Sequence, residues 1–309
     1  MNNSRTELPI DFEICKICGE SSKPKYQLHC GLLFVCQSCQ FHYLDYVDAD
    51  TDLDPKIDES ALTPDVIQYI ETQLQSSEAR FDNHIKLLQE HGGIQDMRVL
   101  DIGCGGGLFL KKARELGAEV MGLELNDERA QYCISKHQLE IVKRPIESEY
   151  WEQHEGSFDA VTLWDVIEHV NYPKETIQAS ARLLKPGGVL LLDTPARDAF
   201  YHRFGEFGYR LSAGRFPTFL NTMYSNHQFG HKQILSTSDM RQIFTKSNLE
   251  TTTVEMFHEL SFPYEFYLKR MLRSSVLAKI TAPLASMFFA VFRIRNKMVV
   301  SGLRRDPQA

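Results

Sequence analysis

The chain has 309 residues, of which 43% are hydrophobic and 24% are charged, and these shares are ordinary for a soluble globular protein. Its formal net charge of −7 argues against a nucleic-acid binder, whose binding surface carries a basic excess. A chain of this length can bury a large core without disulfides, and it has room for one large domain with attachments.

Charge is distributed unevenly along the chain. Residues 269–309 contain nine Lys or Arg and a single acid, Asp306, so an acidic body is followed by a basic tail. The opening residues, MNNSRTELPIDFE, include no apolar run. No secretory signal is therefore predicted, and a cytoplasmic location is expected.

Four of the seven cysteines form two close pairs near the N-terminus. Cys15 pairs with Cys18 and Cys36 with Cys39, each across two residues, and 17 residues separate the pairs. This spacing predicts a closed, structural Zn²⁺ site with four thiolate ligands in a module of residues 10–47. A redox CxxC is the alternative, and the second pair argues against it. The acidic, turn-rich residues 48–62 indicate a linker.

From Thr63 onward, helical and strand patterns alternate. Two helices are expected at 63–75 and 77–90, the first with Thr63 as its N-cap. Strands are then expected at 97–103, 119–125, 139–144, 158–164, 187–195, 249–257 and 297–303, with helices at 108–117, 126–138, 175–184 and 236–247. Such alternation predicts an α/β, Rossmann-like sheet with helices on both faces, built from residues 63–262 and 297–304.

The glycine-rich segment VLDIGCGGGLFL, residues 99–110, carries the strongest functional signal. A strand enters a turn whose glycines let the backbone approach a ligand, and a helix N-terminus follows. Glu124 ends the next strand, about 20 residues later, where an acid accepts hydrogen bonds from ribose hydroxyls in related folds. The pattern therefore predicts a site for a nucleoside-containing cofactor.

Four motifs in order carry a family resemblance: DIGCGGG, LEL, FDAVTLWDVIEHV and LLKPGGVLLLDTP, within residues 77–195. Together they resemble the class I S-adenosylmethionine-dependent methyltransferases. The GCGGG turn, the EH pair, the LKPGG segment and the later HQFGHKQILSTSDM are most similar to the ubiquinone-biosynthesis O-methyltransferases. The resemblance implies S-adenosylmethionine as cofactor.

The resemblance also places residues around that cofactor. Glu124 would bind the ribose, the glycine turn would line the methionine end, and Arg80 would pair with the methionine carboxylate, although a solvated helix arginine is an equal alternative. Apolar and acidic side chains after the next two strands would surround the adenine. The full set is Arg80, Asp101, Gly103, Cys104, Gly105, Glu124, Leu125, Ile146, Glu147 and Trp164.

The WDVIEHV motif allows two interpretations. In the similar O-methyltransferases the corresponding acid-acid-histidine face is associated with a divalent ion, which implies a possible Mg²⁺ near Asp165, Glu168 and His169. Because Mg²⁺ rarely takes histidine, the favoured alternative is that Asp165 caps a helix containing the other two. For methylation of a hydroxyl, His227 and His231 are the candidate proton acceptors, with a structural loop role as the alternative for each.

Two segments fall outside these motifs. Residues 198–226 are rich in aromatics and are expected to form an apolar lid over the acceptor, or else a surface excursion. Residues 263–296 predict a basic amphipathic helical segment. It could lie peripherally on an anionic membrane, or it could pack over the pocket or against a second subunit.

The expected function is methyl transfer to a small molecule, at an oxygen of a lipid-linked, sugar or quinone-like compound. Alternatives are an RNA methyltransferase whose zinc module grips nucleic acid, a catalytically silent partner-binding relative, and a nicotinamide-dependent oxidoreductase. The acidic body argues against RNA, and the intact glycine turn with Glu124 argues against a silent relative.

Overall fold

The computed structural model describes residues 10–49, 56–260 and 263–306. Its main element is a seven-stranded sheet of order β10-β11-β8-β7-β4-β5-β6, in which β11 runs antiparallel to both of its neighbours. The strands are β4 (Arg98–Ile102), β5 (Glu119–Leu123), β6 (Glu140–Val142), β7 (Phe158–Trp164), β8 (Leu184–Pro195), β10 (Leu249–Phe257) and β11 (Lys297–Arg304). The expected parallel sheet is confirmed for β6, β5, β4, β7 and β8.

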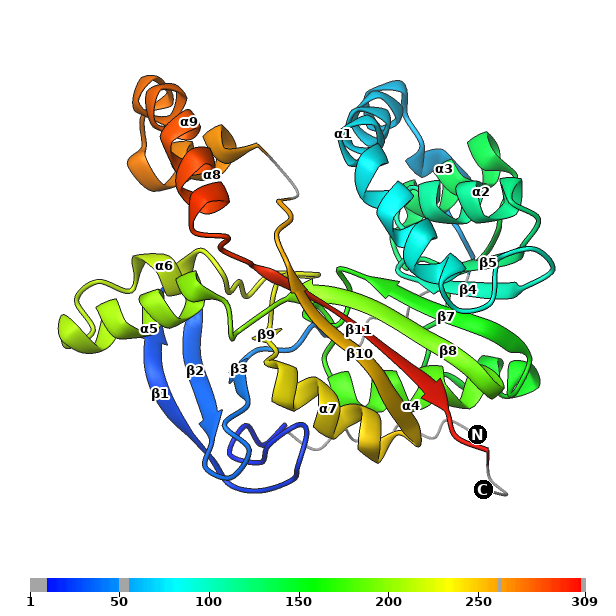
Figure 1. The fold of residues 1–309 in the computed structure, drawn as a ribbon, viewed down its shortest axis with the longest axis horizontal. Helices are drawn as coiled ribbons and strands as arrows, with labels where there is room; N and C mark the ends of the chain where they lie inside the picture. Colours follow the sequence, from blue (N-terminus) through cyan, green and yellow to red (C-terminus); the bar gives the residue numbers. More distant parts are fainter. Residues whose placement is uncertain (1–9, 50–55, 261–262, 307–309) are drawn as a thin grey trace.

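Helices cover both faces of this sheet (Figure 1). On one face lie α1 (Pro64–Gln89), α2 (Leu108–Glu115) and α3 (Asp127–His137); on the other lie α4 (Pro173–Leu183) and α7 (Thr237–Lys246). Alternate strand residues point to opposite faces: Val99 packs in the α1–α2 core, and Leu100 packs in the α4–α7 core. Two short 3₁₀ helices, Glu59–Ala61 and Glu149–His154, lie in connections.

Helix α1 is one 26-residue helix, not the two that the sequence predicts. Ser76 and Ser77 suggest a break, but neither Gly nor Pro interrupts the pattern there, and the helix continues through them. Its Pro64 start and Thr63 N-cap are as expected, with the Thr63 side chain accepting a hydrogen bond from the backbone of Val66.

A second sheet, of order β1-β2-β3-β9, lies at the N-terminal end of the chain. It contains β1 (Ser22–Leu28), β2 (Gly31–Cys36) and β3 (His42–Leu44), and its last strand, β9 (Gln233–Ile234), comes from far along the chain. His42 pairs with Ile234, and Tyr43 pairs with Gln233. The module predicted at 10–47 is thus joined to the larger domain through a shared sheet.

The aromatic insert forms α5 (Phe200–Leu211) and α6 (Thr218–Asn221), which cover this second sheet. The Tyr26 hydroxyl donates to Glu206 at 3.0 Å, and the backbone N–H of Gln27 donates to the Tyr209 hydroxyl at 2.8 Å. The sequence predicted that residues 198–226 form a lid over the acceptor. In the structure, one face of α5 packs on the N-terminal strands.

The last two helices, α8 (Tyr264–Leu272) and α9 (Ser275–Val291), form a hairpin between β10 and β11 that stands away from the sheet (Figure 1). None of the helices in the described ranges is long and apolar enough to cross a membrane.

Candidate active site

A cavity of about 820 Å³ opens at the carboxyl ends of the parallel strands, where ligands bind in open α/β sheets. The glycine turn, the ends of β5 and β7, and one side of α1 form its walls. All ten residues that the resemblance places at the cofactor line this one cavity: Arg80, Asp101, Gly103, Cys104, Gly105, Glu124, Leu125, Ile146, Glu147 and Trp164.

The turn between β4 and α2 requires glycine at two positions. Gly103 has φ +69°, and a Cβ added there would lie 2.6 Å from Val166. Gly107, the N-cap of α2, has φ +74°, and its Cβ would lie 2.7 Å from Leu139. The backbone N–H of Gly103 donates to the carbonyl of Leu123 at 2.7 Å, so the turn is held against the end of β5.

Glu124 is fixed by backbone groups on both sides of its carboxylate. Oε2 accepts from the N–H of Gly105 at 2.8 Å, and Oε1 accepts from the N–H of Asn126 at 2.9 Å. Burial raises the pKa of Glu124, and these N–H groups oppose that rise by favouring the ionised form. Since a carboxylate oxygen has two lone pairs, each one can still accept a ribose hydroxyl.

Asp101 lies beneath the turn and is 2% exposed. The Thr162 hydroxyl donates to its Oδ1 at 2.6 Å. Burial raises the pKa of Asp101 to about 8, because a charged carboxylate in this position would lose its hydration.

A buried charge network adjoins the predicted methionine end. Arg80 donates to Asp165 at 2.7 Å, and the Nζ of Lys297, on β11, lies 2.6 Å from the same carboxylate. Lys297 also bonds Asp193 at 2.9 Å and Glu259 at 3.1 Å. Burial alone would lower the pKa of Lys297, but these carboxylates outweigh it and raise the pKa. Lys297 is therefore a buried cation.

The structure corrects the helix expected after β7. No helix covers residues 165–171, and α4 begins only at Pro173. Asp165 has φ +53° and pairs with cations instead of capping a helix. The structure does not support the Mg²⁺ set expected at Asp165, Glu168 and His169, because the Asp165 carboxylate pairs with Arg80 and Lys297.

Glu168 and His169 form a different cluster, with His231. Their ligand-type atoms lie within 4.8 Å of one another, and the rings of His169 and His231 are 4.7 Å apart. The Thr194 hydroxyl donates to Glu168 Oε2 at 3.0 Å, whereas Oε1 lies 3.9 Å from His169 Nε2. Burial raises the pKa of Glu168 to about 7 and lowers the pKa of His169.

Of these histidines, His169 lines the cavity. The two predicted proton acceptors lie outside the set of lining residues: His227 is exposed, and the Nδ1 of His231 lies 3.0 Å from the carbonyl of Met223. The neighbours Gln228 and Phe229 do reach the wall. Part of the loop that the sequence singled out therefore lies at the cavity wall.

The N-terminal part of the chain contributes Asp48 to the cavity wall, which the sequence did not indicate. Its Oδ2 accepts from Lys232 at 2.7 Å, and Lys232 also donates to the carbonyl of His169 at 2.6 Å. Lys232 immediately precedes β9. The second sheet is thus connected directly to the loop that holds His169.

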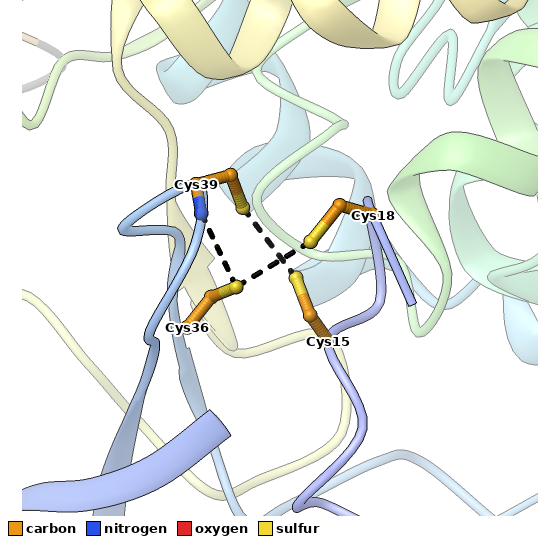
Figure 2. Close-up of side chains that lie close together, drawn as sticks. All are labelled: Cys15, Cys18, Cys36 and Cys39. Atoms are coloured by element: carbon orange, nitrogen blue, oxygen red, sulfur yellow. Dashed lines mark hydrogen bonds between the residues drawn. The ribbon is translucent and has the colours of Figure 1, made fainter. Parts of the chain in front are cut away.

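The four predicted zinc ligands converge, with all four sulfur atoms pointing toward one another (Figure 2). Cys15 Sγ lies 3.6 Å from Cys39 Sγ, and Cys18 Sγ lies 3.4 Å from Cys36 Sγ. A tetrahedral Zn(Cys)₄ site with bonds of about 2.3 Å places its sulfurs about 3.8 Å apart. The backbone N–H of Cys39 also donates to Cys36 Sγ at 3.4 Å. The residues present therefore fit a zinc ion.

Fold and site together define a Rossmann-like α/β domain with a nucleoside-cofactor cavity at its glycine turn. A protein family described as "Methyltransferase domain" matches residues 73–254, more than half of the chain. The chain belongs to this methyltransferase family, and its resemblance to the S-adenosylmethionine-dependent methyltransferases is confirmed.

Curated relatives match a little over a third of the chain. The ubiquinone biosynthesis O-methyltransferase of Cronobacter sakazakii is 36% identical over 118 residues, which are 37% of this chain and 48% of that protein. The Shewanella halifaxensis enzyme of the same name is 37% identical over 113 residues, 35% of this chain and 47% of that protein. The matched region spans about half the length of these relatives.

Solved structures share the fold at low identity. A chain of the complex between the Haloferax volcanii Trm112 methyltransferase activator and a methyltransferase aligns with a TM-score of 0.52 and 14% identity, covering 78% of this chain and 93% of that one. The YcgJ protein of Bacillus subtilis aligns with a TM-score of 0.50 and 18% identity, covering 73% and 99%.

Proposed function

We propose that this protein transfers a methyl group from S-adenosylmethionine to an oxygen atom of a small-molecule acceptor. The observation that carries the proposal is the cavity at the glycine turn, with Glu124 held by two backbone N–H groups at its edge. A lipid-linked, sugar or quinone-like acceptor is proposed, because curated relatives that are 36% identical over part of the chain are named ubiquinone biosynthesis O-methyltransferases.

Residues of this chain suit each part of the cofactor. Glu124 would accept the two ribose hydroxyls, and Leu125 and Ile146 offer apolar surface for the adenine. Arg80 would bind the methionine carboxylate. Its guanidinium is oriented by Asp165 through one nitrogen, while the buried Nε has no hydrogen-bond partner among the described residues. The other donors of the guanidinium fork remain suited to a carboxylate.

The bound cofactor supplies an electrophilic methyl group on a sulfonium, so the protein mainly has to align the acceptor with it. Methylation of a hydroxyl also releases a proton. We propose His169 as its acceptor, since it lines the cavity and burial lowers its pKa, which keeps the imidazole neutral near pH 7. Glu168 lies beside it, with a pKa of about 7, and can stabilise the imidazolium once it forms.

We further propose that Cys15, Cys18, Cys36 and Cys39 bind one Zn²⁺ ion with a structural role. Four thiolates close the coordination sphere, so no position is left for a substrate. The site lies at the end of β2 in the N-terminal sheet. Its four ligands are far from the glycine turn in the sequence.

Calorimetric titration with S-adenosylhomocysteine tests the cofactor site. Wild-type protein is expected to bind in the micromolar range, about −8 kcal/mol. Glu124→Ala should weaken binding at least tenfold, about 1.4 kcal/mol, because both ribose hydroxyls lose their acceptor. Glu128→Ala, at an exposed position on α3, is the matched control and should bind like wild type.

Failure of well-folded wild-type protein to bind S-adenosylhomocysteine would overturn the proposal in favour of a catalytically silent relative. Binding that Glu124→Ala leaves unchanged would place the cofactor elsewhere.

A further inference from the structure

The α8–α9 hairpin has an apolar outer surface. One stripe of α9 is buried or half-buried on the hairpin side: Ala278 is fully buried, and the Phe289 ring packs on the Tyr264 ring of α8 at 5.4 Å. The opposite stripe should then be polar, as in an ordinary amphipathic helix. It is not.

Five large apolar side chains follow each other along that outer stripe at spacings of three or four residues. Each is at least 60% exposed: Val276 (68%), Ile280 (64%), Leu284 (60%), Met287 (60%) and Val291 (68%). Single exposed apolar residues are common on protein surfaces, but a continuous patch marks a contact surface. No described part of the chain packs over this stripe.

Helix α5 repeats the pattern. Its inner face contacts the N-terminal sheet through Glu206 and Tyr209. Its outer face presents Phe200, Phe204, Phe207 and Leu211, which are 53%, 45%, 61% and 76% exposed. Arg203 is exposed between them.

The two exposed faces meet at a groove. Phe200, at the start of α5, lines it from one side, and Phe288 and Phe292, at the end of α9, line it from the other. Arg293 and Arg295 line the same groove, where two guanidinium groups face a single carboxylate, that of Asp198. Apolar side chains from two elements distant in sequence are therefore continuous and are bordered by guanidinium groups.

The charge of this surface is opposite to that of the whole chain. Residues 263–296 contain six Lys or Arg and one acid, Glu265. The chain as a whole has a net charge of −7. Exposed Lys279, Arg293 and Arg295 lie beside or after the apolar stripe. An apolar stripe next to cations suits a partner with an apolar interior and an anionic outer layer.

We propose that the outer faces of α9 and α5 dock onto the surface of an anionic phospholipid bilayer. The apolar side chains insert at the boundary between headgroups and acyl chains, and Lys279, Arg293 and Arg295 contact the phosphate layer. A second copy of the chain is a poorer occupant for a symmetric contact, because it would bring two basic surfaces together. The inference goes beyond methyl transfer and does not depend on it.

Co-sedimentation of the full chain with vesicles tests this docking. Binding is expected to vesicles of phosphatidylcholine and phosphatidylglycerol in equal parts, and not to phosphatidylcholine alone, and it should weaken as salt is raised. The triple variant Val276→Ser/Ile280→Ser/Met287→Ser should bind at least about tenfold more weakly. Lys279→Gln/Arg293→Gln/Arg295→Gln should also bind weakly, because the headgroup contacts are lost.

Leu116→Ser/Ile134→Ser is the matched control, since these side chains are exposed apolar residues at the C-cap of α2 and on α3. It should bind vesicles like wild type. All variants alter exposed positions, and unchanged circular dichroism and S-adenosylhomocysteine affinity would show that they fold. Equal sedimentation with both vesicle types, or with none, would overturn the proposal. A wild-type dimer in sedimentation velocity, together with a monomeric Val276→Ser/Ile280→Ser/Met287→Ser variant, would also overturn it. The stripe would then be covered by a second copy of the chain.

Discussion

At the scale of single residues, burial controls the protonation of Glu168 and His169 more than pairing does. Glu168 is 0% exposed, and only one of its carboxylate oxygens has a hydrogen-bond partner among the described residues. Its pKa therefore rises to about 7, whereas the pKa of the neighbouring His169 falls. A neutral imidazole so placed can take up a proton near neutral pH at small cost in free energy.

The pH dependence of methyl transfer tests the role of His169. Its neutral form accepts the proton, so the rate should fall as pH drops through its pKa. Because burial lowers that pKa below the usual 6.5, the acid limb of the kcat profile should lie below pH 6.5. His169→Gln should remove this limb and reduce kcat by about 10²-fold or more, measured with an acceptor found by screening phenols, sugars and lipid-linked alcohols.

S-adenosylhomocysteine affinity separates this chemical role from a structural one, since His169→Gln should leave it unchanged. His91→Gln, at the end of α1 and outside the cavity-lining set, serves as control. If His231→Gln or His227→Gln removes the acid limb while His169→Gln retains it, the histidines expected from the sequence are the proton acceptors.

The charged residues around the site show where sequence reasoning ends. Arg80 and Glu124 both line the cavity. A strand end marks the position of Glu124, whereas Arg80 was expected there only from the family resemblance, with a solvated helix arginine as an equal alternative. Lys297 could not be predicted, because it reaches Asp193 across 104 residues of sequence through the pairing of β11 with β8. Asp48 likewise becomes a wall residue only once Lys232 holds it. No local pattern specifies either contact.

At the scale of elements, the glycine turn fixes how closely β4, α2 and α3 pack. A Cβ at Gly107 would lie 2.7 Å from Leu139 and 2.8 Å from Cys133. The absence of a side chain at Gly107 therefore lets α3 pack closely against the turn. Gly187 offers a matched comparison. It has a nearly equal φ, +77° against +74°, yet nothing lies within 4 Å of its added Cβ.

Gly107→Ala and Gly187→Ala should therefore share the cost of a left-handed residue, about 1–2 kcal/mol, and differ by the cost of overpacking. We expect Gly107→Ala to lower the free energy of unfolding by about 1–3 kcal/mol more than Gly187→Ala, measured by urea denaturation. Equal losses would mean that α3 yields without cost and that only the backbone conformation requires glycine at position 107.

The elements themselves could be predicted well where both periodicity and end signals were present. The strand expected at 249–257 is β10 as observed, and the helix expected at 236–247 is α7 with its Ser236 capping box. The prediction was wrong at residues 165–171, where three residues at helical spacing form a turn. Tertiary ion pairs to Asp165 determine that turn, and a local pattern does not contain them. The packing of α5 onto the N-terminal sheet was missed for the same reason.

At the scale of the whole molecule, the cysteine cluster and the cavity belong to one continuous structure. The pairs Cys15–Cys18 and Cys36–Cys39 anchor the end of β2, β3 follows, and β9 pairs with β3. Lys232, next to β9, then bonds both Asp48 and the carbonyl of His169. Loss of the ion should therefore affect the acceptor side of the cavity more than the cofactor side, which β4 and β5 form.

Removing the metal tests this coupling. Purified protein is expected to contain about one zinc per chain, and either chelation or Cys36→Ser should raise hydrogen exchange in residues 22–44 and 230–234, while residues 98–123 stay protected. S-adenosylhomocysteine affinity should change by less than about threefold, because Glu124 and the glycine turn follow β5 and β4, in a different sheet from the four zinc ligands. Ser135→Cys, an exposed position on α3 that leaves the four ligands intact, should keep the zinc content unchanged. Loss of protection throughout the chain would instead mean that the module and the larger domain unfold as a single unit. Unchanged hydrogen exchange everywhere would mean that the shared sheet is stable without the ion.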